Sequence, residues 1–419
     1  MELLKYLRKL VPISITDEDE HRTYKIFGIK IKKRNYHPHK MYLKMYRDYP
    51  IDNHKILFKT FKGMYNCNPK YIAEEILRQN LPYELIWVVD ENILKYYHDF
   101  PKNIKLVMRG SKEDYHAHLT AKFWITHKRE NYYIHKGLKK REGQIYIQTW
   151  HGSLGIKKTG EVSHSAKKKF TNLCKQDAAQ YDYLISNGTY TTNFFKECFW
   201  NNGQIMEFGH PRNDIFFRDN TELKRKIQER LNISADKKIV MYAPTFRDDY
   251  NTDCYGIDFE KVLSEINSAG KGEYVFVLKL HPKLMNLRDE IISKYENCEI
   301  IDATDYGDMQ ELLAISDILI TDYSSCAYDF MLTGRPVFIF ATDIKEYNTL
   351  RGLYYPLTTT PFPIAENNSQ LVENIKKFDN EKYLKGVEEF LKGKGCIDDG
   401  HASERVVELI KKLTAESEN

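Results

Sequence analysis

The chain has 419 residues, 42% of them hydrophobic and 29% charged, which is the composition of a globular protein and excludes an intrinsically disordered one. This length suits two α/β domains better than one ordinary core. The formal net charge of +4 is too small to favour nucleic acid as a partner.

Lysine and arginine are concentrated in the first fifty residues, where Leu3, Leu4, Leu7 and Leu10 would share one face of a helix. No stretch approaches the roughly 18–20 apolar residues of a membrane span. The N-terminus also lacks the long apolar stretch and cleavage site of a signal peptide. The seven cysteines are scattered and form no Cys-x-x-Cys pair, as in proteins of a reducing cytosol. We therefore expect a protein that stays on the cytosolic side, with no disulfide framework and no zinc site.

Short apolar runs alternate with longer helical stretches along the rest of the chain, which predicts an α/β fold with parallel sheets. A polar connector at 219–231 separates two series of predicted strands, and an amphipathic helix is predicted at 404–413. We expect two facing Rossmann-like domains, at 41–216 and 217–419, after a basic segment at 1–40, with the terminal helix in the second domain. The predicted strands lie at 55–60, 84–89, 105–108, 122–126, 144–149, 183–186 and 204–208, and then at 238–242, 274–280, 299–301, 318–321 and 336–340.

Ligands of open α/β sheets bind beyond the carboxyl ends of the strands, and several predicted strands here end in polar clusters. The first cluster is Trp150-His151-Gly152-Ser153, after strand 144–149. The glycine after His151 places an imidazole beside backbone that a ligand can approach closely. The alternative is an ordinary turn with an exposed histidine.

The second cluster, at 209–214 after strand 204–208, contains Arg212. Its planar guanidinium suits a phosphate. An Arg–Asp salt bridge inside a domain hinge explains the same residue equally well.

Further polar residues follow strands of the second series. Pro244, Thr245 and Arg247 follow strand 238–242, and His281 follows strand 274–280. Each motif alone is weak, because a polar residue at a strand end is more often structural than catalytic. Together they place imidazole, guanidinium and hydroxyl groups on one edge of the second sheet.

Strand 318–321 leads into Asp322, Ser324 and Ser325, and a predicted helix follows. Hydroxyl groups and free backbone N–H groups at a helix N-terminus form an anion site. Helix capping uses the same geometry, so the two interpretations are compatible.

Several nucleotide-binding and catalytic motifs are absent from the sequence. It contains no Gly-x-x-x-x-Gly-Lys-Ser/Thr loop, no Gly-x-Gly-x-x-Gly fingerprint after a strand and no Gly-x-Ser-x-Gly elbow. A P-loop ATPase and an α/β-hydrolase are therefore disfavoured. Asp248-Asp249 is a candidate cation site, but neighbouring acids in a loop are more often solvated, and we predict no metal site.

Taken in order, the strand-end motifs resemble those of the CDP-glycerol glycerophosphotransferase family of teichoic-acid and capsule assembly. The resemblance covers roughly residues 140–410, and the ordered set is specific although no single motif is. Much of the family has proline soon after His-Gly-Thr, whereas this chain has Ser153-Leu154-Gly155-Ile156, which leaves the acceptor less defined. The motifs are Trp150-His151-Gly152, Gly209-His210-Pro211-Arg212-Asn213-Asp214, Tyr242-Ala243-Pro244-Thr245-Phe246-Arg247, Leu280-His281-Pro282, Thr321-Asp322-Tyr323-Ser324-Ser325 with Asp329, Arg335-Pro336-Val337 and Asp399-Gly400-His401-Ala402-Ser403-Glu404-Arg405-Val406.

The resemblance implies a GT-B-type fold, with the acceptor on the N-terminal domain and a CDP-polyol on the C-terminal one. It implies that a hydroxyl of a lipid-linked teichoic-acid or capsule-type acceptor attacks the β-phosphorus of CDP-glycerol or CDP-ribitol, and that CMP leaves. His151 would be the general base, since imidazole titrates near the working pH, and His281 would be at the donor diphosphate. The implied donor-site residues are Arg212, Pro244, Thr245, Arg247, Thr321, Asp322, Ser324, Ser325 and Asp329, and the acceptor-side residues are Trp150, Gly152, Ser153 and Lys157.

The resemblance also bears on partners. No tightly bound cofactor is expected, only the CDP-polyol donor, and segment 1–40 would bind an anionic membrane surface, although an ordinary packed helix explains its leucines equally well. A GT-B glycosyltransferase that uses a nucleotide sugar is the first alternative, with the same fold. A non-catalytic, membrane-associated scaffold is the second, and the pair His151 and His281 disfavours it. The sequence leaves open which polyol and which acceptor are used. It also leaves open whether the protein is a primase or a polymerase, and its oligomeric state.

Overall fold

The computed structural model describes residues 13–418, with gaps at 19–20, 27–28, 35–37, 92, 94–98, 159–167, 202, 248–251, 270–271, 294 and 296–299. For 13–34, 168–169 and 269 it describes the backbone alone. The predicted leucine face at 3–10 and the candidate cation site Asp248-Asp249 lie outside the described residues.

The N-terminal segment contains a three-stranded antiparallel sheet that the sequence analysis did not predict. The alternation Ile29-Lys30-Ile31-Lys32 has the period of two that favours a strand. The strands are β1 (Ile13–Glu18), β2 (His21–Ile26) and β3 (Ile29–Arg34).

Seven parallel strands form the first large sheet, in the order β10-β9-β8-β7-β4-β5-β6. Both faces are covered, so its strands are apolar along most of their length, and β7 is buried at every position. Tyr146 and Phe195 lie in the core on one face, and Phe58 and Trp87 in the core on the other. The strands are β4 (Asp52–Lys59), β5 (Glu84–Val89), β6 (Ile104–Met108), β7 (Ala121–Thr126), β8 (Ile145–Gln148), β9 (Tyr183–Ser186) and β10 (Gln204–Glu207).

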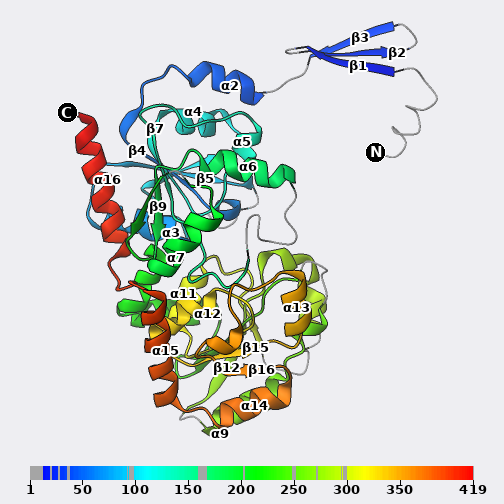
Figure 1. The fold of residues 1–419 in the computed structure, drawn as a ribbon, viewed down its shortest axis with the longest axis vertical. Coiled ribbons are helices and arrows are strands. Elements are labelled where there is room, and N and C mark those ends of the chain that lie inside the picture. Colours follow the sequence, from blue (N-terminus) through cyan, green and yellow to red (C-terminus); the bar gives the residue numbers. More distant parts are fainter. Residues whose placement is uncertain are drawn as a thin grey trace.

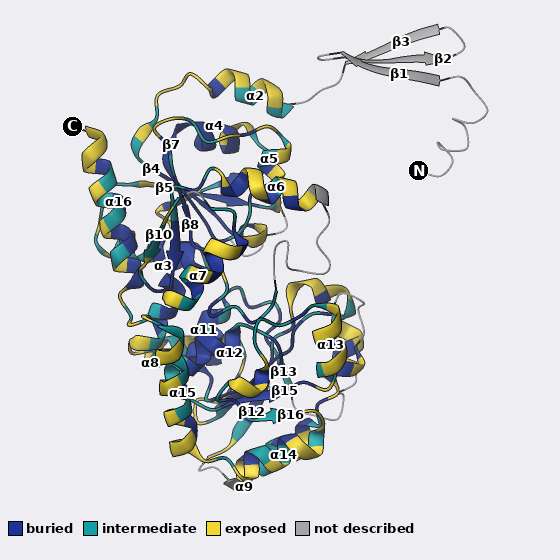
Figure 2. Ribbon diagram, in the orientation of Figure 1, coloured by how far each residue is buried: buried dark blue, intermediate teal, exposed yellow. Residues whose placement is uncertain are grey.

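Helices flank this sheet, with buried residues toward the strands and exposed residues outward (Figure 2). The Ser111 side chain accepts a hydrogen bond from the Asp114 N–H and so caps one of them. The helices are α2 (Pro38–Tyr46), α3 (Cys67–Arg78), α4 (Lys112–Thr120), α5 (Asn131–His135), α6 (Lys168–Ala178) and α7 (Thr189–Cys198), with the 3-10 helices η1 (Phe61–Gly63) and η4 (Pro211–Phe217).

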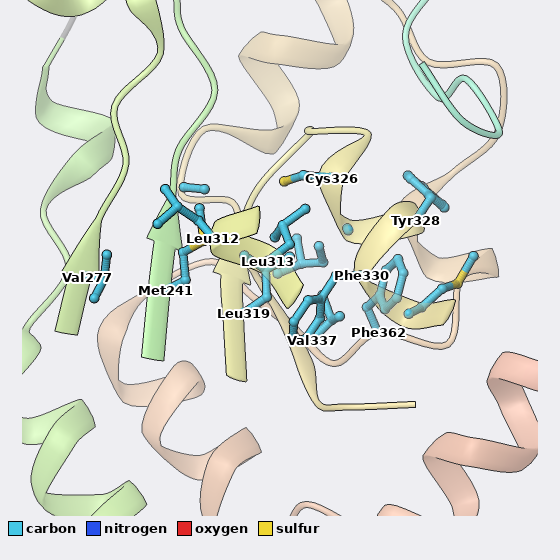
Figure 3. Packing of buried hydrophobic residues seen from close by; sticks show 14 of the residues in the cluster. Met241, Val277, Leu312, Leu313, Leu319, Cys326, Tyr328, Phe330, Val337 and Phe362 are labelled. Carbon is cyan, nitrogen blue, oxygen red and sulfur yellow. The ribbon is translucent and has the colours of Figure 1, made fainter. Parts of the chain in front are cut away.

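Six parallel strands form the second large sheet, in the order β13-β12-β11-β14-β15-β16. Figure 3 shows part of its core, where Met241, Leu319 and Val337 of neighbouring strands meet Leu312 and Phe330. Burying a large apolar side chain contributes about 1.5–3 kcal/mol relative to leaving it exposed. The strands are β11 (Lys238–Ala243), β12 (Tyr274–Leu278), β13 (Ile300–Asp302), β14 (Ile318–Thr321), β15 (Val337–Phe340) and β16 (Ile364–Ala365).

The second sheet carries its own helices, and α11 and α12 lie on its side toward the first sheet (Figure 1). The helices are α8 (Thr221–Arg230), α9 (Phe259–Ala269), α10 (Arg288–Ser293), α11 (Met309–Ile315), α12 (Cys326–Phe330), α13 (Ile344–Leu350), α14 (Asn368–Lys376) and α15 (Asn380–Lys394). The 3-10 helices are η5 (Asp253–Tyr255), η6 (Pro282–Leu287), η7 (Met331–Thr333) and η8 (Leu357–Thr359).

The chain returns to the first sheet at its C-terminus. Val406, Val407 and Ile410 of α16 (Ala402–Glu418) are buried in the core of the first sheet, so the terminal helix packs on the first domain and not on the second, where it was expected. The crossing passes Gly188, where a β-carbon would collide with the carbonyl of Gly395. This close approach requires glycine.

The prediction of an α/β fold with two parallel sheets is confirmed, and the twelve predicted strands overlap β4 to β15. The two-residue strand β16 was not predicted, because so short a segment has no readable periodicity. Among the described helices, none is long and apolar enough to cross a membrane.

Candidate active site

His151 lies in the loop after β8, next to Trp150, whose φ of 52° is left-handed. Its Nδ1 atom is 2.7 Å from the carbonyl oxygen of His127. A carbonyl oxygen only accepts, so Nδ1 carries the proton and the neutral ring presents an unprotonated Nε2. The residue keeps solvent-exposed surface, although the protein surrounds the ring closely enough to desolvate it. This is the tautomer that a general base needs at Nε2.

The surrounding protein lowers the pKa of His151 to about 4, mainly by desolvation. The hydrogen bond to the His127 carbonyl opposes the decrease, and the charges of Arg212 and Arg129 add to it. His151 is therefore neutral near pH 7. An anionic substrate beside the ring favours the protonated form, so the affinity of His151 for a proton rises when such a substrate binds.

His281 follows β12 and has the opposite tautomer. Its Nδ1 accepts a hydrogen bond of 3.2 Å from the backbone N–H of Lys283. A backbone N–H only donates, so the proton of the neutral ring is on Nε2. Desolvation lowers the pKa of His281 to about 4, and the charge of Lys157 adds to this effect. His281 thus presents a neutral N–H group that can donate a hydrogen bond to a phosphate oxygen.

Four lysines surround His281 closely enough to lower its pKa: Lys157, Lys283, Lys62 and Lys279. Two come from the first half of the chain and two flank His281 itself. Burial also lowers the pKa of Lys279 to about 8, while its Nζ donates to backbone carbonyls of the loop after β13. A cluster of this charge attracts a polyanion such as a diphosphate.

The loop 150–158 connects the histidines, because it begins beside β8 and ends against the second half of the protein. Lys157 and Leu353 form an antiparallel backbone bridge. The N–H of Tyr354 donates to the carbonyl of Ile156 at 2.8 Å. The loop that carries His151 is therefore fixed to the segment after α13.

Lys157 was expected on the acceptor side, but its ammonium group lies against the second half, near Asp322, Arg351 and Arg247. Burial lowers the pKa of Lys157 to about 8, Asp322 opposes this, and the two arginines add to it. Among the described residues, none forms a hydrogen bond or ion pair with this ammonium group. Lys157 is therefore available to an anion at the edge of the second sheet.

Arg212, expected at a phosphate, is only 3% exposed and is occupied by protein partners. Its Nη2 forms an ion pair of 2.9 Å with Asp329, and its Nη1 donates to the carbonyl of His151. An Arg–Asp salt bridge, as in the alternative interpretation, is thus present, but its carboxylate is Asp329 of α12 and not Asp214 of the same motif. The geometry favours a role for Arg212 and Asp329 in positioning the His151 loop over direct contact with a phosphate.

Ser153 extends this network and is 1% exposed. His210 Nδ1 donates to the Ser153 hydroxyl at 2.8 Å, and the hydroxyl donates to Asp329. The second Asp329 oxygen accepts from Gln310 at 2.9 Å. Ser153, expected on the acceptor side, therefore links the His151 loop to α12.

Asn68 is a residue of the site that the sequence analysis missed. Its amide nitrogen donates to the carbonyls of Thr149 and Trp150, and its oxygen accepts from the N–H of Arg212. It is fully buried and joins the start of the loop to the backbone of Arg212. An asparagine next to a helix start has no sequence signal for contacts more than eighty residues away.

Arg247 is also held by protein groups. It forms ion pairs of 2.9 Å with Asp322 and 2.6 Å with Asp343, and its guanidinium lies 5.0 Å from the ring centre of Tyr323. The N–H of Thr245 donates to Asp322, and the buried Thr245 hydroxyl has no hydrogen-bond partner within the described part of the chain. Thr245 thus offers a free hydroxyl, whereas Arg247 and Asp322 shape the loop after β11, which begins at the buried Pro244.

The three hydroxyls expected to bind phosphate differ in the hydrogen bonds that they make within the protein. Thr321 is fully buried and donates to the carbonyl of Ala243 at 2.6 Å. Ser324 accepts from the N–H of Cys326 at 3.3 Å. Ser325 is half-buried at the N-cap of α12 and makes no side-chain capping hydrogen bond. Ser325 is the hydroxyl most available to a ligand.

Gly152 lies between His151 and Ser153, where an added β-carbon would lie 3.3 Å from the Trp150 indole nitrogen. Within the described residues, no group of three or more His, Cys, Asp or Glu side chains is arranged to hold a metal ion.

Comparison with known proteins adds the family. Residues 41–412 match the family model CDP-Glycerol:Poly(glycerophosphate) glycerophosphotransferase. The chain is 34% identical to a teichoic acid poly(glycerol phosphate) polymerase of Staphylococcus epidermidis, over 85% of this chain and 50% of that protein. It is 32% identical to the enzyme of the same name from Bacillus spizizenii, over 86% of this chain and 92% of that one. The chain thus spans half of the first relative and nearly all of the second.

Among solved structures, the wall teichoic acid polymerase TagF, in a histidine-to-asparagine variant soaked with CDPG, is similar with a TM-score of 0.78. The identity is 32%, and the match covers 91% of this chain and 94% of that one. This similarity agrees with the two-sheet architecture described above, and the predicted GT-B-type fold is confirmed.

Proposed function

The chain belongs to the CDP-glycerol:poly(glycerophosphate) glycerophosphotransferase family, and we propose that it transfers glycerol phosphate from CDP-glycerol to a lipid-linked teichoic-acid or capsule-type acceptor. CDP-ribitol is the second donor to consider. Glycerol phosphate comes first because the two relatives described above are named for poly(glycerol phosphate).

The reaction joins an acceptor hydroxyl oxygen to the β-phosphorus of the donor. The bond between that phosphorus and the bridging oxygen breaks, and CMP leaves with the bridging oxygen. The proton of the hydroxyl passes to His151 Nε2, which is unprotonated because Nδ1 donates to His127. His151 is held by Arg212, which donates to its carbonyl oxygen.

The donor diphosphate lies at the edge of the second sheet. His281 donates from Nε2 to a phosphate oxygen, because its Nδ1 is occupied by the Lys283 N–H. Lys157 and Lys279 add positive charge beside it. Ser325 and Thr245 contribute hydroxyls: Ser325 makes no capping hydrogen bond, and Thr245 has no hydrogen-bond partner among the described residues. These groups stabilise the charge that builds on the leaving phosphate.

The observation that carries this proposal is the complementary tautomers of His151 and His281. The first presents a lone pair to solvent and the second an N–H, and a single loop leads from the first to the lysine beside the second. Phosphoryl transfer to a hydroxyl needs both kinds of group, one at the attacking oxygen and one at the phosphate.

A donor screen tests the proposal. The purified protein is incubated with a lipid-linked acceptor and, separately, with CDP-glycerol, CDP-ribitol or a UDP-sugar, and the released nucleotide is measured. We expect CMP from a CDP-polyol. Release of UDP with a UDP-sugar, and no CMP from either CDP-polyol, would instead support a nucleotide-sugar glycosyltransferase with the same fold.

We also propose that the protein works at the cytoplasmic face of the membrane as a peripheral protein, with its basic N-terminal segment on the anionic surface. Basic residues near such a surface contribute about 1 kcal/mol each, screened over about 8–10 Å at physiological salt. Sedimentation with anionic and neutral vesicles at two salt concentrations tests this, using the full chain and a form that begins at residue 41. Equal sedimentation of both forms would move the membrane contact elsewhere.

A further inference from the structure

Arg129 lies among three aromatic rings on the first-sheet side of the site. The carbon centre of its guanidinium is 4.5 Å from the Phe199 ring, 5.3 Å from Trp200 and 5.8 Å from Trp150. Phe199 is fully buried and packs edge-on against Trp150 at 4.6 Å. The rings therefore hold a half-buried guanidinium in one place.

No carboxylate of the described residues forms an ion pair with Arg129, whose guanidinium donates a hydrogen bond of 3.5 Å to the carbonyl of Cys174. The other arginines of the site differ, since Arg212 pairs with Asp329 and Arg247 with Asp343. Aromatic faces position a cation without neutralising it, so the charge of Arg129 remains available to an anion.

This cation is next to the proposed base. Trp150, one of its three rings, lies 4.2 Å from the ring of His151. Lys175 lies 5.3 Å from the ring centre of Trp200. Arg129 is thus linked to His151 through the ring of Trp150.

The backbone at both tryptophans supports a specific arrangement. Trp150 has a φ of 52° and Trp200 a φ of 50°, in the left-handed region that non-glycine residues seldom adopt. Such conformations persist where surrounding contacts enforce them, and they cluster at ligand sites. Both tryptophans whose rings contact Arg129 therefore have an energetically unfavourable backbone conformation.

We propose that Arg129 binds the phosphodiester group of the acceptor that lies one polyol unit behind the attacking hydroxyl. This inference rests on the proposed function and assigns the acceptor a subsite. The terminal unit would place its hydroxyl at His151 Nε2, and its phosphodiester would reach the guanidinium beside Trp150. A planar guanidinium recognises two phosphate oxygens at once, which fixes the acceptor as well as attracting it.

The subsite predicts a preference among acceptors. A chain end that already carries a phosphodiester binds through Arg129, whereas an end whose glycerol is attached through a neutral linkage gains nothing from it. The arrangement therefore favours extension of an existing poly(polyol phosphate) over addition of the first unit.

The test compares two synthetic acceptors with the same terminal glycerol, one linked through a phosphodiester and one through a neutral ether. Initial rates with CDP-glycerol give KM and kcat for the wild-type protein, Arg129→Gln and Arg129→Lys. In the glutamine variant we expect the KM of the phosphodiester acceptor to rise about tenfold or more, as for loss of a hydrogen bond to a charged group. Its kcat and its KM for the ether acceptor should change little, and the lysine variant should recover part of the loss.

Arg109→Gln is the matched control, because Arg109 also lies over an aromatic ring, Tyr132 at 5.9 Å, but is paired with Asp90 at 2.9 Å. It should leave both KM values unchanged. An equal effect of Arg129→Gln on the two acceptors would overturn the subsite. If that variant does not fold, the wild-type protein decides: a KM for the phosphodiester acceptor no lower than for the ether refutes the inference. Failure of the wild-type protein to consume CDP-glycerol with either acceptor would instead count against the proposed function.

Discussion

Arg212 and Asp329 form a buried ion pair, with 2.9 Å between Nη2 and Oδ2, that joins the segment after the first sheet to helix α12 beside the second. Both side chains are 4% exposed. The pair also orients the loop that carries His151, because Arg212 donates to the His151 carbonyl.

Asp329→Asn should therefore destabilise the protein. It leaves the Arg212 charge buried without its partner, a change that costs about 3–5 kcal/mol in comparable sites. Urea unfolding followed by circular dichroism measures it. Glu222→Gln is the control, because Glu222 pairs with Arg225 on an exposed helix face and its loss should not move the midpoint. Equal midpoints for Asp329→Asn and the wild type would contradict the positioning role.

His151→Ala should abolish turnover while leaving CDP-glycerol binding intact. The residue lies in the first half, whereas the groups proposed for the donor lie mainly in the second, and loss of a general base typically costs 10²–10⁴-fold, about 3–5 kcal/mol, in rate. Turnover and calorimetric titration with CDP-glycerol measure the two effects. His54→Ala is the histidine control. His54 lies near the start of β4, at the edge of the first sheet opposite to the edge that carries the His151 loop. A turnover near that of the wild type in His151→Ala would remove the base assignment.

The pH dependence follows from the lowered pKa of His151. The folded-state pKa is about 4 and the ordinary value is 6.5, so protonation of the folded protein begins at lower pH than protonation of the unfolded chain. His151 therefore contributes its full share to the stability of the fold above pH 6.5, and this contribution is lost as the pH falls from 6.5 toward 4. In kcat/KM against pH, we expect a plateau through neutrality and an acid limb well below 6.5. An acid limb centred at or above 6.5 would contradict the environment described here.

His281→Ala should raise the KM for CDP-glycerol and lower kcat. A hydrogen bond to a charged group contributes about 1.5–3 kcal/mol, equivalent to roughly 10- to 150-fold. His281→Gln keeps an N–H donor on a side chain of similar reach, so this variant should lose less kcat/KM for CDP-glycerol than His281→Ala. Steady-state kinetics with varied CDP-glycerol distinguish them, and equal losses in the two variants would show that the N–H is not what the donor uses.

The hydroxyl at the end of β14 and the one at the start of α12 should have different roles. Ser325→Ala should raise the KM for CDP-glycerol about tenfold or more, as for loss of a hydrogen bond to a charged group, here the diphosphate. Thr321→Val should lower the unfolding midpoint instead, because it leaves the buried Ala243 carbonyl without its donor. Kinetics and urea unfolding on both variants test this, and the reverse pattern would restore Thr321 as the phosphate contact.

The sequence predicted the sheets well because many of their strands are continuous apolar runs, as in β12 and β15, and in a globular chain such short runs usually form buried strands. It also found the histidines, since His151 and His281 follow such runs directly. The roles of their neighbours depended on tertiary contacts. Arg212 and Ser153 look like ligand groups in the sequence, but each has a partner on α12 more than one hundred residues away.

The same reason explains the residues that were missed or displaced. Asn68 and Gln310 carry no motif, and their hydrogen bonds form only once separate elements of the chain pack together, Asn68 with the backbone just after β8 and Gln310 with Asp329 of α12. Lys157 follows His151 by six positions in the sequence, which predicts a place on the acceptor side. The backbone bridge to Leu353 instead brings its ammonium group to the second half of the protein.

The most direct test of the central claim is ³¹P NMR of CDP-glycerol during turnover with a lipid-linked acceptor. Transfer of glycerol phosphate predicts loss of both diphosphate resonances, with equal growth of the CMP monoester signal and of one new phosphodiester signal. This should occur in the wild type and not in His151→Ala. Appearance of CDP, with its diphosphate intact, would show that the bond to the polyol carbon breaks instead and would contradict the proposed function.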